Sequence, residues 1–506
     1  MASLATSRLL PIRTPRSESA EWTTTDDSMA AAAEEPVTPT ARLMEAIYIV
    51  VIIGLGSPVN LPVFSAGIAA ELARYPRFRS IQVTDGSKDG NNPRWARRAV
   101  NVEDHMIVPA LETLEADPDQ VVEDYVASLY RLPMDSSRPL WEFHFLDIPT
   151  SEAASTVVLR VHHSLGDGMS LITLLLASAR SAADPARLPA MPKQQQVRTG
   201  AIYVPRQRQP TSAGGLLVFL AWVWAYLMLA WNTMVDVAYF AATVMFLTDP
   251  HTIFTRSDAV VPSRRFVHRS IRLDDVKSIK KAMNCTVNDV LVGVTSAALS
   301  HYYFRNSGNT NTSKICLRSV LLVNTRPTPS LQTYAKLIES GKSNDVAWGN
   351  HLGYILLPFH LAMHDDPLEY VRKANKTMDR KKSSLEVILT CKTSEFFVKM
   401  FGLKAGAFIF RRMFANTTIL FSNVTGPTES VELCGHPVVF IAPTIYGGPQ
   451  ALTVHYQSYS TTIKVVLSVD EEIFPNYNQL LDDFVNTFGH IKDAASRLHN
   501  SARKRN

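Results

Sequence analysis

The feature that most limits what this chain can fold into is the stretch VHHSLGDGMS, residues 161–170. It follows STVVLRV, an apolar run rich in β-branched residues that predicts a buried strand. It leads into MSLITLLLASAR, residues 169–180, which predicts an apolar helix. The sequence therefore predicts a strand–turn–helix corner that carries two adjacent histidines, an aspartate and two glycines.

The residue types at this corner suit proton transfer. A neutral imidazole is a suitable general base near pH 7. Adjacent strand side chains point to opposite faces, so His162 and His163 cannot both enter one cleft while the chain is extended. Gly166 and Gly168 allow positive φ and a close approach of the backbone. Asp167 is able to bond the turn, cap the helix, pair with an arginine or orient the imidazole.

Two other interpretations of the corner stay open. One is a buried histidine pair followed by a turn aspartate without any chemical role. The other is a metal site, which needs a third ligand at a suitable spacing, and the sequence offers none.

The length of the chain predicts more than one domain, because 506 residues exceed what one core usually holds. The runs IYIVVIIGLG, RPLWEFHFLD and TTIKVVLSVD predict further strands, and residues 287–303 and the chain's end predict helices. We divide the chain into a disordered tail (1–40), an N-terminal domain (41–189), a linker (190–262) and a C-terminal domain (263–506).

Composition excludes several classes of function. The net charge of +5 is diffuse and comes without zinc-ligand spacing or an RNA-binding signature, so we expect no nucleic-acid partner. The four cysteines are far apart and predict neither a disulfide framework nor a zinc cage. Residues 1–40 lack the apolar segment of a secretory signal, which indicates a cytosolic setting for most of the mass.

The motif HHxxxDG resembles that of acyltransferases with the chloramphenicol-acetyltransferase-like fold. Within them, the chain resembles the plant bifunctional wax ester synthase/diacylglycerol acyltransferase family. The likeness covers about residues 34–497. The sister family that acylates alcohols and amines carries a DFGWG loop, and this chain does not contain that sequence. The stretches that carry it are EEPVTPTARL (34–43), NVEDH (101–105), RPLW (138–141), VNDV (287–290), SNVTGP (422–427) and GPQALTVHYQSY (448–459).

The resemblance implies two similar α/β domains, each a mixed sheet covered by helices, with a tunnel between them. Acyl-CoA enters from one side and the alcohol from the other. The resemblance makes His163 the general base, His162 a supporting residue and Gly168 part of the turn. It makes Asp167 a structural residue, for which Arg326 is our candidate partner. No acyl-enzyme, metal or cofactor is expected, because acyl-CoA is itself the substrate.

Other matched motifs suggest roles around this base. Asn288 and Asp289 match the family's ND motif, in which the amide of Asn288 is a candidate oxyanion donor. Capping of a helix N-terminus by these two residues is the alternative. Pro139, Leu140 and Trp141 are candidates for shaping the substrate pocket, with ordinary core packing as the alternative for the tryptophan.

The linker contains an apolar segment, residues 216–247, that opens with sixteen uncharged residues. Sixteen helical residues reach about 24 Å, short of a hydrocarbon core of about 30 Å. The family motifs lie before and after this segment in the sequence and must build one site. A single crossing of the membrane would place them on opposite sides of it. We therefore expect it to lie in the membrane interface or to dip and return, with the bend near residues 232–236. A pair of core helices is the alternative.

We expect an acyltransferase of the cytosolic face of the endoplasmic reticulum membrane, with the plasma membrane as a second location. Its partners would be acyl-CoA, a long-chain fatty alcohol and diacylglycerol. Isoprenoid alcohols remain open as acceptors. Peptide-synthetase condensation domains share HHxxxDG but work beside carrier modules, for which this chain has no room. A non-catalytic lipid-binding tether is the alternative from another class.

Overall fold

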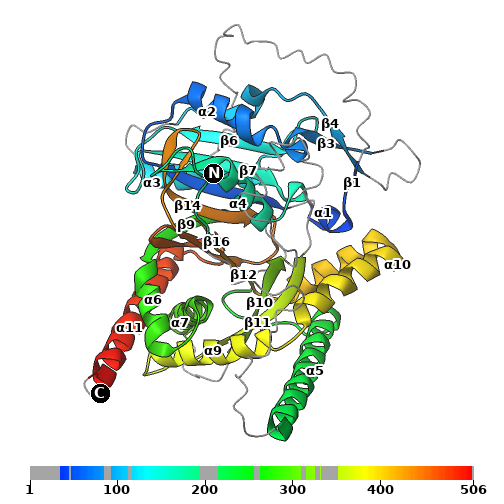
Figure 1. Ribbon diagram of the computed structural model, residues 1–506, viewed down its shortest axis with the longest axis vertical. Helices are drawn as coiled ribbons and strands as arrows, with labels where there is room; N and C mark the ends of the chain where they lie inside the picture. Colours follow the sequence, from blue (N-terminus) through cyan, green and yellow to red (C-terminus); the bar gives the residue numbers. More distant parts are fainter. Residues whose placement is uncertain are drawn as a thin grey trace.

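The computed structural model describes residues 35–44, 47–84, 93–111, 117–192, 215–255, 263–308, 315–324, 331 and 352–503. Within them two large sheets pack against each other, and helices cover them (Figure 1). The helices are α1 (Pro39–Leu43), α2 (Leu61–Gly67), α3 (Pro118–Ser128), α4 (Gly168–Ala177), α5 (Gly215–Met245), α6 (Leu273–Met283), α7 (Val287–Asn306), α9 (Leu368–Lys382), α10 (Glu386–Ala415) and α11 (Tyr477–Arg503).

The first sheet carries the predicted corner. Its strands, in spatial order, are β5 (Met106–Ile107), β6 (Trp141–Leu146), β7 (Ser155–His162), β2 (Tyr48–Leu55), β14 (His436–Tyr446), β13 (Val431–Leu433) and β8 (Ala179–Ser181). All eight residues of β7 are buried, which explains its continuous apolar and β-branched sequence. One face of the sheet packs on α2 and α4, and the other faces the second sheet.

The second sheet has a helical side and an inner side. Its strands are, in order, β11 (Leu352–Leu361), β10 (Ile315–Asn324), β12 (Ile419–Val424), β15 (Leu452–Tyr459), β16 (Thr462–Asp470) and β9 (Arg264–Arg272). Helices α6, α7, α9 and α11 cover the helical side with a large apolar core. On the inner side, β9 and β16 meet the first sheet, and α5 and α10 cover the far strands.

The chain crosses between the two sheets late in the sequence. β14 pairs antiparallel with β2, and Thr444 lies opposite Val50. β13 continues the same sheet to β8. The assignment of all residues 263–506 to one C-terminal domain therefore needs a correction, because residues 431–446 belong to the first sheet. The predicted limits at residues 189 and 262 stay predictions.

The N-terminal tail ends earlier than predicted. In the small sheet of β1 (Glu35–Pro36), β4 (Arg94–Arg97) and β3 (Ser80–Val83), Glu35 pairs with Trp95. The Thr38 side chain then caps α1 by accepting a hydrogen bond from the Ala41 N–H. Residues 35–40 are thus ordered, and assigning them to a disordered tail was wrong because strand pairing and a helix cap hold them.

Helix α5 is one continuous helix of 31 residues. The bend expected near residues 232–236 is wrong, because the polar residues there bind other helices instead of making a turn. The Asn232 side chain donates to the Ser383 carbonyl at 3.2 Å, and Asp236 is fully buried beside Lys381 at 2.9 Å. Phe219–Met245 is long and apolar enough to cross a membrane, and it is the one such helix among the described residues.

Candidate active site

The predicted corner is present, and its parts follow directly from the sequence. β7 ends at His162, a 3-10 turn spans His163–Leu165, and α4 begins at Gly168. Asp167 is the N-cap of α4, and its Oδ1 accepts a hydrogen bond from the Ser170 N–H at 2.8 Å. The capping role considered for Asp167 is confirmed.

His162 is held by structural contacts. Its Nδ1 accepts from the Ser164 N–H at 3.2 Å and lies 2.6 Å from the Ser164 Oγ. That hydroxyl also accepts a hydrogen bond from the Gln82 side chain at 2.7 Å. The Tyr48 ring meets the imidazole edge-on, with centroids 5.1 Å apart. These contacts fit the supporting role predicted for His162.

His163 is buried where the two halves of the chain meet. Its N–H donates to the Ile47 carbonyl at 2.9 Å, and this bond fixes the start of the turn. The Ile47 side chain belongs to a small apolar cluster that also contains Met44, Leu322 of β10 and Phe410 of α10. The strand alternation used to separate the two imidazoles applies only as far as His162, because the chain leaves the extended conformation at His163.

The two glycines of the motif do not use the left-handed region. Gly166 is extended, with φ 176°, and Gly168 is the first residue of α4. The conformational freedom that the sequence offers at these glycines is therefore not used in the turn, which passes from the 3-10 segment through Gly166 and Asp167 into α4. Among the residues that the structure describes, no atom lies within 4 Å of a Cβ built on Gly168.

Asp167 is almost fully buried, at 1% exposure. Its Oδ2 has no hydrogen-bond partner among the residues that the structure describes. Arg326, the predicted partner, lies in residues 325–330, outside the described part of the chain. The pairing of Asp167 with Arg326 stays a prediction.

The PLW motif lies directly beside the histidines. The Leu140 carbonyl accepts the His162 N–H at 3.0 Å, so this motif helps to fix the end of β7. Trp141 is fully buried in the core of the first sheet and stacks on His105, with centroids 4.0 Å apart. Core packing thus accounts for Trp141. A role of Pro139 and Leu140 in the substrate pocket stays a prediction.

The two residues of the ND motif have different environments. Asp289 is buried and forms a capping box with Thr286 at the start of α7. It also accepts a hydrogen bond from Asn375 of α9 at 2.9 Å, so Asp289 joins two helices. Asn288 is exposed and accepts a hydrogen bond from Asn423 of β12, which links the VNDV and SNVTGP stretches. The oxyanion role of Asn288 stays a prediction.

Sequence reasoning missed a row of polar side chains on the inner face of β15. Leu452, Val454 and Tyr456 point into the helical core, so Thr453, His455 and Gln457 point to the opposite face. All three are buried, and among the described residues His455 Nε2 and Gln457 Oε1 have no hydrogen-bond partner. Burial lowers the pKa of His455 to about 4. The signal was the alternation LTVHYQSY within a motif already singled out.

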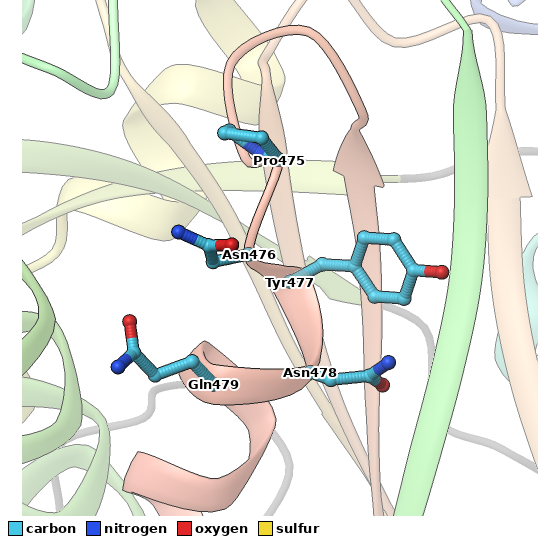
Figure 2. A pocket seen from close by; sticks show the side chains of 5 residues that line it. All are labelled: Pro475, Asn476, Tyr477, Asn478 and Gln479. Atoms are coloured by element: carbon cyan, nitrogen blue, oxygen red, sulfur yellow. The ribbon is translucent and has the colours of Figure 1, made fainter.

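A surface pocket lies elsewhere, at the start of α11 (Figure 2). Its lining residues are Pro475, Asn476, Tyr477, Asn478 and Gln479, and in the view Tyr477 points away from Gln479. None of the predicted site residues lines this pocket, so it takes no part in the candidate site.

Family models match both halves of the chain. The wax ester synthase/diacylglycerol acyltransferase catalytic domain matches residues 25–291, and the WS/DGAT C-terminal domain matches residues 348–492. Wax ester synthase/diacylglycerol acyltransferase 5 of Arabidopsis thaliana is 40% identical over 477 residues, covering 91% of this chain and 93% of the relative. Wax ester synthase/diacylglycerol acyltransferase 4 of the same plant is 40% identical over 480 residues, covering 92% and 91%.

Solved structures with the same fold are more distant in sequence. The wax ester synthase/diacylglycerol acyltransferase from Marinobacter aquaeolei VT8 has a TM-score of 0.58 at 17% identity, covering 91% of this chain and all of that one. The first condensation domain of the calcium-dependent antibiotic synthetase, in complex with substrate analogue 2a, has a TM-score of 0.55 at 13% identity, covering 92% and 97%. These likenesses confirm the predicted two-domain α/β fold. With the two family models and the Arabidopsis relatives, they show that the chain belongs to the wax ester synthase/diacylglycerol acyltransferase family of O-acyltransferases.

Proposed function

We propose that this protein transfers a fatty acyl group from acyl-CoA to a long-chain alcohol or to diacylglycerol, with His163 as the general base. The observation that carries the proposal is the HHxxxDG corner, in which His162 is held by Ser164 and Tyr48 and His163 is buried where the two halves meet. The family match supports the class of reaction.

The reaction needs one base and no covalent intermediate on the protein. His163 accepts the hydroxyl proton while the alcohol oxygen attacks the thioester carbonyl carbon. The tetrahedral intermediate collapses, the carbon–sulfur bond breaks, and the imidazolium returns the proton to the coenzyme A thiolate. The products are an ester and free coenzyme A. Burial of a long acyl chain contributes roughly 0.8 kcal/mol per methylene, which favours an apolar channel.

The exposed N-terminal half of α5 supports binding of the enzyme to a membrane. None of residues 219–231 is buried, and Trp222, Trp224 and Trp231 are all more than half exposed. These thirteen residues reach roughly 20 Å, shorter than a hydrocarbon core of about 30 Å. We place this half in the interface of the endoplasmic reticulum membrane, on its cytosolic face. Because the two sheets pack against each other, both halves of the enzyme must lie on the same side of the membrane.

Turnover of a substrate panel tests the proposal. Purified full-length protein is given labelled palmitoyl-CoA with hexadecanol, diacylglycerol or an isoprenoid alcohol, and His163→Ala serves as the inactive control. Formation of wax ester or triacylglycerol supports the proposal. Binding of acyl-CoA without any ester product contradicts it and favours the tether, and ester formed only on the isoprenoid alcohol contradicts the proposed acceptor.

Cell fractionation and protease protection in sealed microsomes test the location. The protein is expected to sediment with endoplasmic reticulum membranes, and both halves should be digested from the cytosolic side. Replacement of residues 219–231, the exposed half of α5, by a flexible linker should weaken this association. Protection of one half alone would contradict the proposed placement.

A further inference from the structure

Exposed apolar side chains concentrate on two neighbouring helices. Most of the large apolar side chains exposed among the described residues belong to α5, its C-terminal end and α10. The more exposed ones on α5 include Phe219, Trp224 and Trp231. Those on α10 are Leu389, Phe396, Met400, Phe401 and Phe408. A soluble protein rarely exposes so many large apolar side chains on two neighbouring helices.

Helix α10 combines this apolar surface with positive charge. It exposes Lys392, Lys399, Lys404 and Arg411. Its two acids are Glu386, which is buried against Lys381, and Glu395. Aromatic and aliphatic side chains flanked by basic residues are the composition that binds an anionic bilayer surface.

The two helices are joined through the C-terminal half of α5 and both ends of α10. Arg412 of α10 donates to the Val244 and Met245 carbonyls at the end of α5, at 3.3 and 2.9 Å. At the other end of the contact, the Leu385 N–H donates to the Thr233 hydroxyl at 3.0 Å. In Figure 1, α5 and α10 meet at one side of the second sheet and project from the body of the protein.

A sharp bend shapes α10. Gly402 has φ +79°, which interrupts the helix between the two exposed residues Phe401 and Phe408. Past the bend, a Cβ built on Gly406 would lie 3.9 Å from the Leu43 side chain of α1. Phe410 then joins the cluster of Ile47, whose carbonyl accepts the His163 N–H. Buried and half-buried apolar contacts therefore connect α10 to the backbone of the corner that carries His163.

We propose that α10 and the exposed half of α5 form one surface that docks on an anionic lipid bilayer beside the corner that carries His163. The proposal deepens the proposed function, because it adds α10 as a second bilayer-contacting helix and names the lipid charge that it selects. A hydrophobic acceptor dissolved in the bilayer then reaches the enzyme next to α1 and the turn at His163.

Vesicle binding of the full-length protein tests this surface without relying on activity. The triple variant F396S/M400S/F401S removes apolar area from α10 and leaves α5 intact. We expect its affinity for vesicles of phosphatidylcholine mixed with phosphatidylserine to fall about tenfold or more. The matched control V63S/V108S/M363S changes exposed apolar residues elsewhere and should bind like the wild type.

Charge and self-association give two further outcomes. The variant K392Q/K399Q/K404Q should lose affinity for the mixed vesicles and bind pure phosphatidylcholine vesicles as the wild type does. Unchanged binding of the α10 triple variant would overturn the proposal. So would a wild-type dimer in sedimentation that the triple variant converts to monomers without a change in vesicle binding, because a second copy would then cover the surface.

Activity assays separate this proposal from the function on which it rests. With butanol and acyl-CoA in solution, the α10 triple variant should turn over like the wild type. With hexadecanol dissolved in mixed vesicles, its rate should fall about tenfold. If the triple variant matched the wild type with both alcohols, the proposed bilayer-docking role of α10 would be contradicted. A wild type without any turnover would refute the proposed function, and the vesicle comparison would still decide the surface.

Discussion

His162 and His163 are adjacent in the chain but have different tasks in the structure. Replacing His163 by alanine should lower turnover about a hundredfold or more, the usual scale for loss of a general base. Replacing His162 by alanine should reduce turnover less. It should lower the free energy of unfolding by about 1–3 kcal/mol, because Ser164 loses a buried hydrogen-bond partner. Steady-state rates and denaturant unfolding of both variants check this, and an inactive His162 variant beside an active His163 variant would reverse the assignment.

Asp167 allows its cap and its charge to be tested separately. Asparagine caps a helix as well as aspartate does, so D167N should keep the bond to the Ser170 N–H and melt near the wild type. D167A should lose about 1 kcal/mol or more. If the buried Oδ2 also orients the corner, D167N will lose activity at unchanged melting temperature. Paired melting and rate measurements distinguish the cap from the orienting role.

At the scale of elements, α5 depends on one buried carboxylate. Asp236 binds Lys381 at 2.9 Å and Arg380 at 2.6 Å, and Lys381 also binds Glu386. D236A should destabilise the protein by about 3 kcal/mol, because Lys381 stays buried with half of its compensating charge removed. The control is D379A, at an exposed residue paired with Lys382, which should lower the free energy of unfolding by less than about 1 kcal/mol. Denaturant unfolding measures both, and equal losses would contradict a structural role for Asp236.

Local patterns predicted the elements around the corner, and long-range contacts decided what the sequence did not show. β2, β6, β7 and α4 follow from apolar runs and a capping aspartate, which act within a few residues. The pairing of β14 with β2 joins residues almost four hundred positions apart, and an alternating strand does not specify its sheet. Asn232 and Asp236 suggested a bend because a polar residue in an apolar run indicates a break, unless a distant partner binds it.

At the scale of the whole molecule, two buried histidines make stability depend on pH. Burial, with Lys464 and Arg269 nearby, lowers the pKa of His268 to about 3, and burial lowers that of His455 to about 4. In the second sheet, His268 lies on the edge strand β9 and His455 on the interior strand β15. Because the unfolded chain takes up protons below about pH 6.5 and the folded one does not until about pH 3–4, stability falls as the pH falls through this window.

The expected loss is roughly 2 kcal/mol per histidine at pH 5. Unfolding free energies measured between pH 4 and 7 check the slope. The double variant H268Q/H455Q should have a flatter profile than the wild type, and an identical slope would show that these two groups do not set the pH dependence.

The crossover of β13 and β14 has a consequence for biosynthesis. Until residue 446 has left the ribosome, β2 has an open edge, because the strand that covers it is made last in its sheet. The roughly 250 residues between β8 and β14 take on the order of 10–50 s to translate. Helix α5 emerges during that interval, so it can reach a membrane before the first sheet closes. With α5 at the bilayer, as proposed, the nascent chain would be held there while the β2 edge, which is prone to aggregation, is still unpaired.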